Sequence, residues 1–121
     1  MLGWLLTIEG RAVRCDVPDI GDAVECGLRS DLIDYTNIGP GVDVWRDLTA
    51  SVTGKPLNAA AIGLVDYMLD QTAAMLPRIH GNAFICSHDE WGQPVGIGPE
   101  GWATLCKFFP QLDQKLSEEC D

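Results

Sequence analysis

The sequence predicts an α+β fold in a single domain spanning residues 1–121. Two observations lead to this class. Three pairs of short apolar segments, each pair joined by turn residues, predict three β-hairpins. A segment with helical spacing follows each pair, which gives the order ββα-ββα-ββα. We therefore expect an antiparallel sheet from three hairpins, packed on a long central helix at residues 58–76.

The strand pairs are marked by their turns. The segments "GWLLTIEG" and "RAVRCDVP" meet at Glu9-Gly10, where glycine supplies the positive φ of a tight turn. The segments "DLIDYTNI" and "VDVWRDLT" flank Gly39-Pro40-Gly41, a strong turn signal. The third pair, "NAFICSH" and "QPVGIG", turns around "DEWGQ". Pro94 confines its second strand to an edge or to a very short length.

The stretch "CDVPDIGDAVEC" has an acid at every third position: Asp16, Asp19, Asp22 and Glu25. A calcium loop needs oxygen ligands at alternate positions, so this spacing does not fit one. Asp19 instead fits an N-cap, with Asp22 as an acid in the first helical turn. The stretch therefore predicts a short amphipathic helix from about 19 to 29.

The longest predicted helix begins after Asn58 as its cap and ends at Pro77. Apolar residues cover most of its circumference, which predicts burial in the fold or against a partner chain. Gly63 and the alanines at 59–61 and 73–74 permit close approach, so we expect a homodimer through residues 58–76. Pro99 begins a further helix with Trp102 and Leu105 on one face, and residues 111–121 form a short helix or an acidic tail.

Composition and charge exclude several function classes. The formal net charge is −10, which argues against direct binding of nucleic acid, since that needs Lys and Arg for the phosphates. No apolar run reaches the length of a membrane span, and "MLGWLLTIEGR" lacks the features of a signal peptide. The five cysteines lack regular spacing, and without an export signal we expect free thiols. A Cys15–Cys26 disulfide is the alternative and would need an oxidising compartment. We expect a cytoplasmic protein that acts without membrane or nucleic acid.

Reactive side chains gather at "CSHDE", residues 86–90. On a strand, Cys86 and His88 point to the same side. With His80 and Asp89 nearby, a zinc site or a Cys–His nucleophile can be drawn. Cys86 also follows the apolar run "AFI", so burial in the core is the alternative. We expect no catalytic residue, no metal and no cofactor here, and a small Cys–His or metal-dependent enzyme stays as an alternative.

The segment "DLIDYTNIGPGVDVWRDLTASVTG" resembles the wing of winged-helix regulators, in which a β-hairpin closes with a similar "LT…G" stretch. The resemblance covers about a fifth of the chain. It implies a degenerate winged-helix-like transcriptional regulator. The sequence departs from that family in two ways: a strand pair and one helix replace the two upstream helices, and a basic recognition helix is absent.

Acids and tryptophans alternate in the two later hairpins. Exposed Trp beside charge is a usual composition of interface hot spots, and capping of the core is the alternative for each Trp. We expect a small acidic non-enzymatic protein that binds and modulates another protein, one with a basic, nucleic-acid-binding surface, and inhibition is the expected effect. The chain resembles phage inhibitors of host defence and bacterial immunity proteins only in being small, acidic and free of motifs. The predicted partner-binding residues are Asp31, Asp34, Asp43, Trp45, Asp47 and Trp91.

Overall fold

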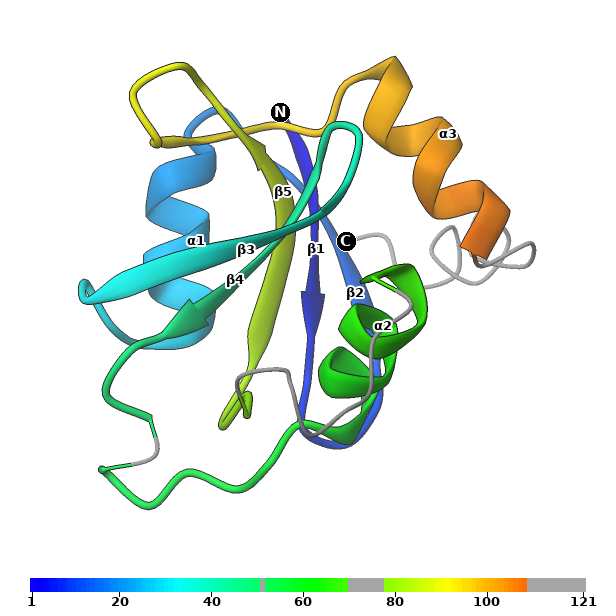
Figure 1. The fold of residues 1–121 in the computed structure, drawn as a ribbon. Coiled ribbons are helices and arrows are strands. Elements are labelled where there is room, and N and C mark those ends of the chain that lie inside the picture. The colour runs from blue at the N-terminus through cyan, green and yellow to red at the C-terminus, as the bar shows by residue number, and fades with distance from the viewer. Residues whose placement is uncertain (51, 70–77, 109–121) are drawn as a thin grey trace.

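The computed structural model describes residues 1–50, 52–69 and 78–108. Over this part of the chain, one sheet lies between helices on both faces (Figure 1). Its elements follow one another as β1 (Leu2–Leu6), β2 (Ala12–Asp16), α1 (Ile20–Leu28), β3 (Ile33–Gly39), β4 (Val42–Asp47), α2 (Ala59–Leu69), β5 (Ala83–His88), β6 (Pro94–Val95) and α3 (Pro99–Phe108).

The sheet is antiparallel, with the strand order β2-β1-β5-β4-β3, and the two-residue β6 pairs with the end of β5. This confirms the α+β class. The three predicted antiparallel strand pairs are present, but the predicted ββα-ββα-ββα arrangement of the sheet is wrong. β5 comes late in the chain but inserts between β1 and β4, so it joins the first two hairpins into one sheet. β5 also pairs with β6, but only over two residues of each strand.

β5 takes the centre because both of its faces are apolar. Ala83 and Ile85 point into a core cluster with α2 and α3, where Trp4 stacks on Trp102 at 5.3 Å between ring centroids. Phe84 and Cys86 point the other way, into a second cluster with α1. A strand covered by helices on both sides can be apolar throughout, as the run "AFIC" is.

The predicted long central helix is also wrong. The described helix α2 has eleven residues and lies on one face of the sheet (Figure 1). Ala61, Leu64 and Val65 of α2 are buried in the protein's own core. Residues 70–77 lie outside the described part, and so does the C-terminal segment 109–121. The homodimer through residues 58–76 therefore stays a prediction.

The predicted helix starts are confirmed by their capping bonds. Asp19 Oδ1 accepts the Asp22 N–H at 3.2 Å, and Asn58 Oδ1 accepts the Ala61 N–H at 3.0 Å. These bonds satisfy amide groups that have no partner inside the helix. α3 begins at Pro99, as expected. Within the described residues, no helix has both the length and the apolar character to cross a membrane.

Candidate partner-binding surface

Three of the six predicted partner-binding residues are inside the protein. Asp43, Trp45 and Asp47 have exposed fractions of 1%, 2% and 6%. They alternate along β4, so all three point to the face that α1 covers. The expectation that Trp45 is an exposed anchor is therefore corrected. Asp31 and Asp34 are exposed near the start of β3, and Trp91 is 76% exposed between β5 and β6.

Asp47 has a structural role at one end of the sheet. Its Oδ2 accepts a bond from Lys55 Nζ at 2.8 Å, and its Oδ1 accepts the N–H and the hydroxyl of Thr49. Lys55 Nζ also donates to the Leu28 carbonyl at the end of α1. Burial alone would raise the pKa of Asp47, but these hydrogen bonds outweigh it and lower the pKa to about 2. This carboxylate therefore ties β4 to α1 and to the following loop.

Asp43 forms a polar network with residues from two other strands. The strand register places Asp43 opposite Cys86, so His88, two residues further, lies on the same face. Nδ1 of His88 is 2.6 Å from Asp43 Oδ2, and Asn37 donates to Asp43 Oδ1 at 2.9 Å. The His88 ring stacks on Tyr35 at 4.5 Å between centroids. The buried carboxylate thus orients a His88 side chain that is 35% exposed.

Cys86 and His88, the predicted nucleophile pair, lie in different environments. Cys86 is fully buried, and burial together with the nearby negative charge of Asp43 raises the pKa of its thiol. A protonated, buried thiol is a poor nucleophile. His80 lies before the opposite end of β5, where its Nδ1 faces the Lys55 carbonyl at 2.9 Å. Among the described residues, no group of three or more His, Cys, Asp or Glu side chains could hold a metal ion.

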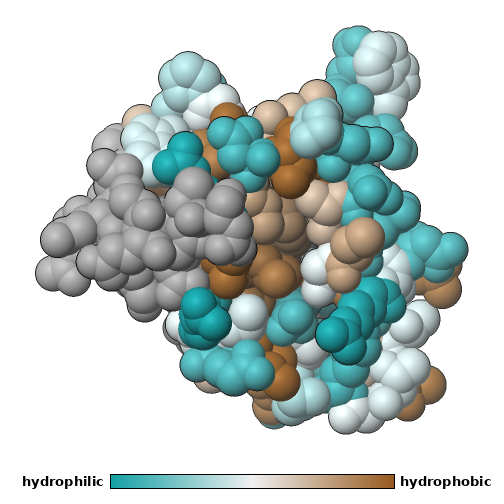
Figure 2. All heavy atoms as spheres, turned by 180° about the vertical axis from the view of Figure 1, so that it is seen from behind, coloured by the Kyte–Doolittle hydropathy of each residue, from teal (hydrophilic) through white to brown (hydrophobic). Residues whose placement is uncertain are grey.

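The turn after His88 holds Trp91 in the solvent. Asp89 Oδ1 accepts the N–H groups of Trp91 and Gln93, each at 2.9 Å. Gly92 completes the turn with φ +77°, a conformation that favours glycine. The turn projects beyond the body of the molecule, and Figure 2 shows it from behind at the upper right, with a mainly hydrophilic surface. An exposed Trp is therefore fixed on a defined turn rather than on a loose loop.

Acids from two distant parts of the sequence lie at the same end of the sheet as this turn. Asp16 pairs with Leu2 in the sheet, and the Leu2 carbonyl accepts the Ile97 N–H at 2.7 Å, so the end of β2 lies near the start of α3. The described segments that form this end, residues 1–3, 15–25 and 87–101, contain no Lys or Arg. We call it the acidic end, defined by Asp16, Asp19, Asp22, Glu25, Asp89, Glu90 and Glu100.

The opposite end of the sheet has a different composition. It contains the 7–11 turn, the end of α1, the loop after β4 and residues 78–82, which partly surround a common pocket. Four bases lie in or next to these segments, together with three acids: Arg11, Arg29, Lys55 and Arg78 with Glu9, Asp31 and Asp47. Charge is therefore separated along the molecule, and the negative charge is concentrated at the end of the sheet that carries the Trp91 turn.

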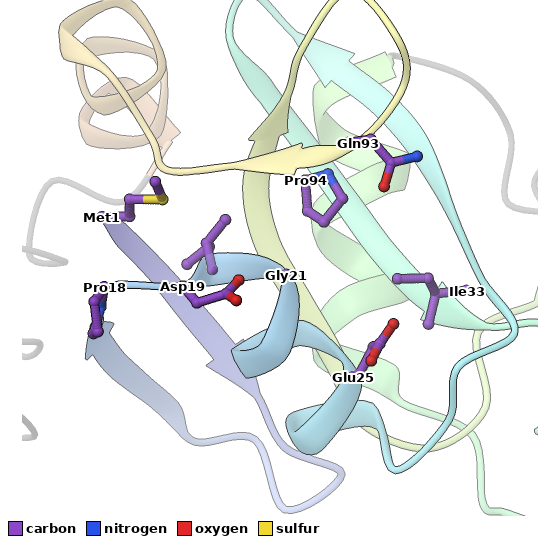
Figure 3. Close-up of a pocket in the computed structure, with 9 residues that line it drawn as sticks. Met1, Pro18, Asp19, Gly21, Glu25, Ile33, Gln93 and Pro94 are labelled. Carbon is purple, nitrogen blue, oxygen red and sulfur yellow. The ribbon is translucent and has the colours of Figure 1, made fainter.

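A pocket of about 380 Å³ opens at the acidic end (Figure 3). α1 supplies Ile20, Gly21 and Glu25 to its wall, and the segment after Trp91 supplies Gln93 and Pro94. The remaining lining residues come from the N-terminus, the α1 cap and β3: Met1, Pro18, Asp19 and Ile33. The pocket therefore joins the α1 acids to the Trp91 turn.

Comparison of the chain with protein-family models, with curated proteins and with solved structures found no match. The strand pairings show how far the segment that resembles a winged-helix wing is built like one. The segment that carries it forms β3 and β4, and β4 pairs on its other side with β5. The hairpin is thus part of the main sheet rather than an appended wing.

Proposed function

We propose that this protein binds another protein through its acidic end and thereby modulates that partner, with inhibition as the expected effect. One observation carries the proposal: Trp91 is 76% exposed on a turn that Asp89 fixes, at an end of the molecule with seven acids. A partner that covers a large exposed aromatic ring removes much apolar area from water, which stabilises the complex. Trp is also the residue type most enriched at interface hot spots.

The charge around Trp91 selects the kind of partner. A charged surface attracts the opposite charge over a distance of roughly 10 Å at about 0.1 M salt, and this attraction raises the association rate. The acidic end therefore favours a basic protein surface, such as one that otherwise binds nucleic acid. Phosphates themselves would be repelled. In this proposal the acids accelerate encounter and Trp91 holds the complex together.

The enzyme alternative has weaker support. Asp43 and His88 form an oriented pair of the kind that general bases use. The thiol closest in sequence, Cys86, is buried and protonated, so it offers no nucleophile to that base. The pair has a simpler role, because His88 leads directly into the Trp91 turn and its ring packs on Tyr35. We therefore assign it to positioning the turn.

The test is affinity capture from extracts of the source cells with three immobilised proteins: wild type, Trp91→Ala and Val52→Ala. Val52 is 87% exposed, in the loop that follows β4, so its variant is the matched control. We expect wild type and Val52→Ala to retain the same protein and Trp91→Ala to lose it. With that purified partner, Trp91→Ala should cost about 2 kcal/mol or more of binding free energy.

The salt dependence of the same complex provides a second readout. The association rate should fall steeply as salt is added, whereas Trp91→Ala should act mainly on the dissociation rate. Circular dichroism of both variants checks that they are folded. Equal retention by Trp91→Ala and wild type, or an association rate indifferent to salt, would refute the proposal.

A further inference from the structure

The pocket at the acidic end combines apolar walls with two acids. Ile33 and Pro94 stand on one side of it, and Asp19 and Glu25 come from the cap and the second turn of α1 (Figure 3). Its nine lining residues include no Lys, Arg or His. The amino group of Met1 is engaged next to the pocket, where it donates to the Val17 carbonyl at 2.8 Å and lies 3.4 Å from Asp16.

These groups discriminate between classes of ligand. The N-terminus of α1 would by itself favour an anion, because the helix dipole is positive there. Asp19 already accepts an amide of that first turn, and the surrounding acids make the potential negative. An anionic ligand would be repelled, whereas a cation gains from Asp19 and Glu25. A long aliphatic stem could in addition cover Ile33 and Pro94, as Lys and Arg stems do on apolar surfaces.

We propose that this pocket receives a basic side chain, Arg or Lys, of the protein that binds at the acidic end. The inference rests on the proposed function and adds a specific contact to it. Gln93 and Pro94 of the pocket follow Trp91 by two and three residues, Gln93 in the same turn and Pro94 at the start of β6. A single partner surface therefore reaches both places: an apolar site covers Trp91 and a neighbouring basic side chain enters the pocket.

The probe that tests the pocket is a capped pentapeptide, Gly-Ser-Arg-Ser-Gly, titrated at millimolar concentration into the ¹⁵N-labelled protein. The control peptide contains citrulline in place of Arg, which has nearly the same shape without the charge. A third peptide contains Lys. We expect the Arg and Lys peptides to shift the amide signals of Gly21, Glu25 and Gln93, and the citrulline peptide to shift them at least about threefold less at equal concentration.

Two variants separate a local contact from general attraction. Glu25→Gln removes a pocket carboxylate and should weaken binding of the Arg peptide by about threefold. Asp22→Asn removes one charge from the same helix at an exposed position outside the lining, so it should change the affinity less. Equal shifts with Arg and citrulline, or equal effects of the two variants, would overturn the pocket proposal.

The two proposals can fail separately. If Trp91→Ala abolishes capture of the partner while the peptides fail to distinguish charge, the acidic end binds a partner and the pocket has no part in it. If the Arg peptide binds in the pocket while Trp91→Ala leaves capture unchanged, the pocket is a cation site and the Trp91 interface is refuted.

Discussion

Asp43 and Asp47 lie four residues apart on β4, and each is held by a group from another element. Lys55 bonds to Asp47, while Asn37 and His88 bond to Asp43. A buried carboxylate without such partners would be very costly. Lys55 lies 8 residues from Asp47 in the sequence. Asn37 lies 6 residues from Asp43, and His88 lies 45 residues from it. Substitution of either acid by Lys would place a positive charge in the interior, so these positions cannot report on surface electrostatics.

Asp47 should make the stability of the protein depend on pH in the acid range. Its pKa falls from the usual 3.8 to about 2 on folding, because the bonds from Lys55 and Thr49 outweigh the effect of burial. The folded state therefore favours the ionised form. Its stabilising contribution is fully present above the unfolded-state pKa and is lost as the pH falls toward the folded-state value.

The measurement is urea unfolding of wild type and Asp47→Asn between about pH 6 and about pH 2. We expect the difference in unfolding free energy between the two to shrink over this range by on the order of 2 kcal/mol. Asp31→Asn, at an exposed position, serves as the control and should show little change. A difference between wild type and Asp47→Asn that stays constant with pH would contradict the assigned role.

At the scale of elements, close backbone contacts decide where α3 sits. Gly101 of α3 packs on the Gly41 backbone in the turn between β3 and β4, and a Cβ atom at residue 101 would overlap the Gly41 carbonyl oxygen. Thr104 also donates to the Pro40 carbonyl at 3.0 Å. α3 is thus fixed to the β3–β4 turn by its first turns as well as by Leu105 in the core.

Gly101→Ala should therefore destabilise the protein by about 2 kcal/mol, a typical cost of overpacking. Gly63→Ala is the matched control, because Gly63 also lies within a helix and a Cβ there would contact nothing within 4 Å. Alanine is the better helix former, so this variant should gain roughly 0.5–1 kcal/mol.

Urea unfolding of both variants distinguishes the outcomes. A neutral Gly101→Ala would show that α3 does not pack on the turn as described. A destabilising Gly63→Ala would mean that this face of α2 is covered, as the predicted homodimer through residues 58–76 requires. Light scattering on that variant would then show whether a second copy covers it.

Across the whole molecule, two apolar clusters share one sheet, and β5 contributes to both. Cys86, in the central strand, is fully buried, whereas Cys26 on α1 is exposed. A reagent can reach Cys86 only when the sheet opens, because the strand is covered by its neighbours and by α1. Its reactivity should therefore follow the global unfolding equilibrium.

Iodoacetamide labelling followed by peptide mass mapping tests this expectation. Cys26 should react quickly in the folded protein, and Cys86 should react slowly. Labelling of Cys86 should accelerate in step with unfolding as urea is added and should be faster in Asp47→Asn than in wild type. Equal labelling of Cys86 and Cys26 without denaturant would contradict a buried β5 and would reopen the Cys–His enzyme alternative.

The sequence by itself determined the local elements. Asp19 and Asn58 as caps, Pro99 as a helix start and glycine turns at Gly10 and Gly41 are set by neighbours within four residues. Such signals depend on backbone geometry that a short segment fixes alone. The α+β class followed from them. The exposure of Trp91 also agrees with its place in a polar turn, and its role in partner binding stays a prediction.

Only the tertiary structure decided which strand is central and which acids are exposed. The insertion of β5 between β1 and β4 is a long-range pairing, and it turned Asp43 and Trp45 inward under α1. The same pairing brought acids of residues 16–25 beside those of residues 89–100, which are distant in sequence. Composition records charge but not position, so the acidic end and its pocket exist only once the chain has folded.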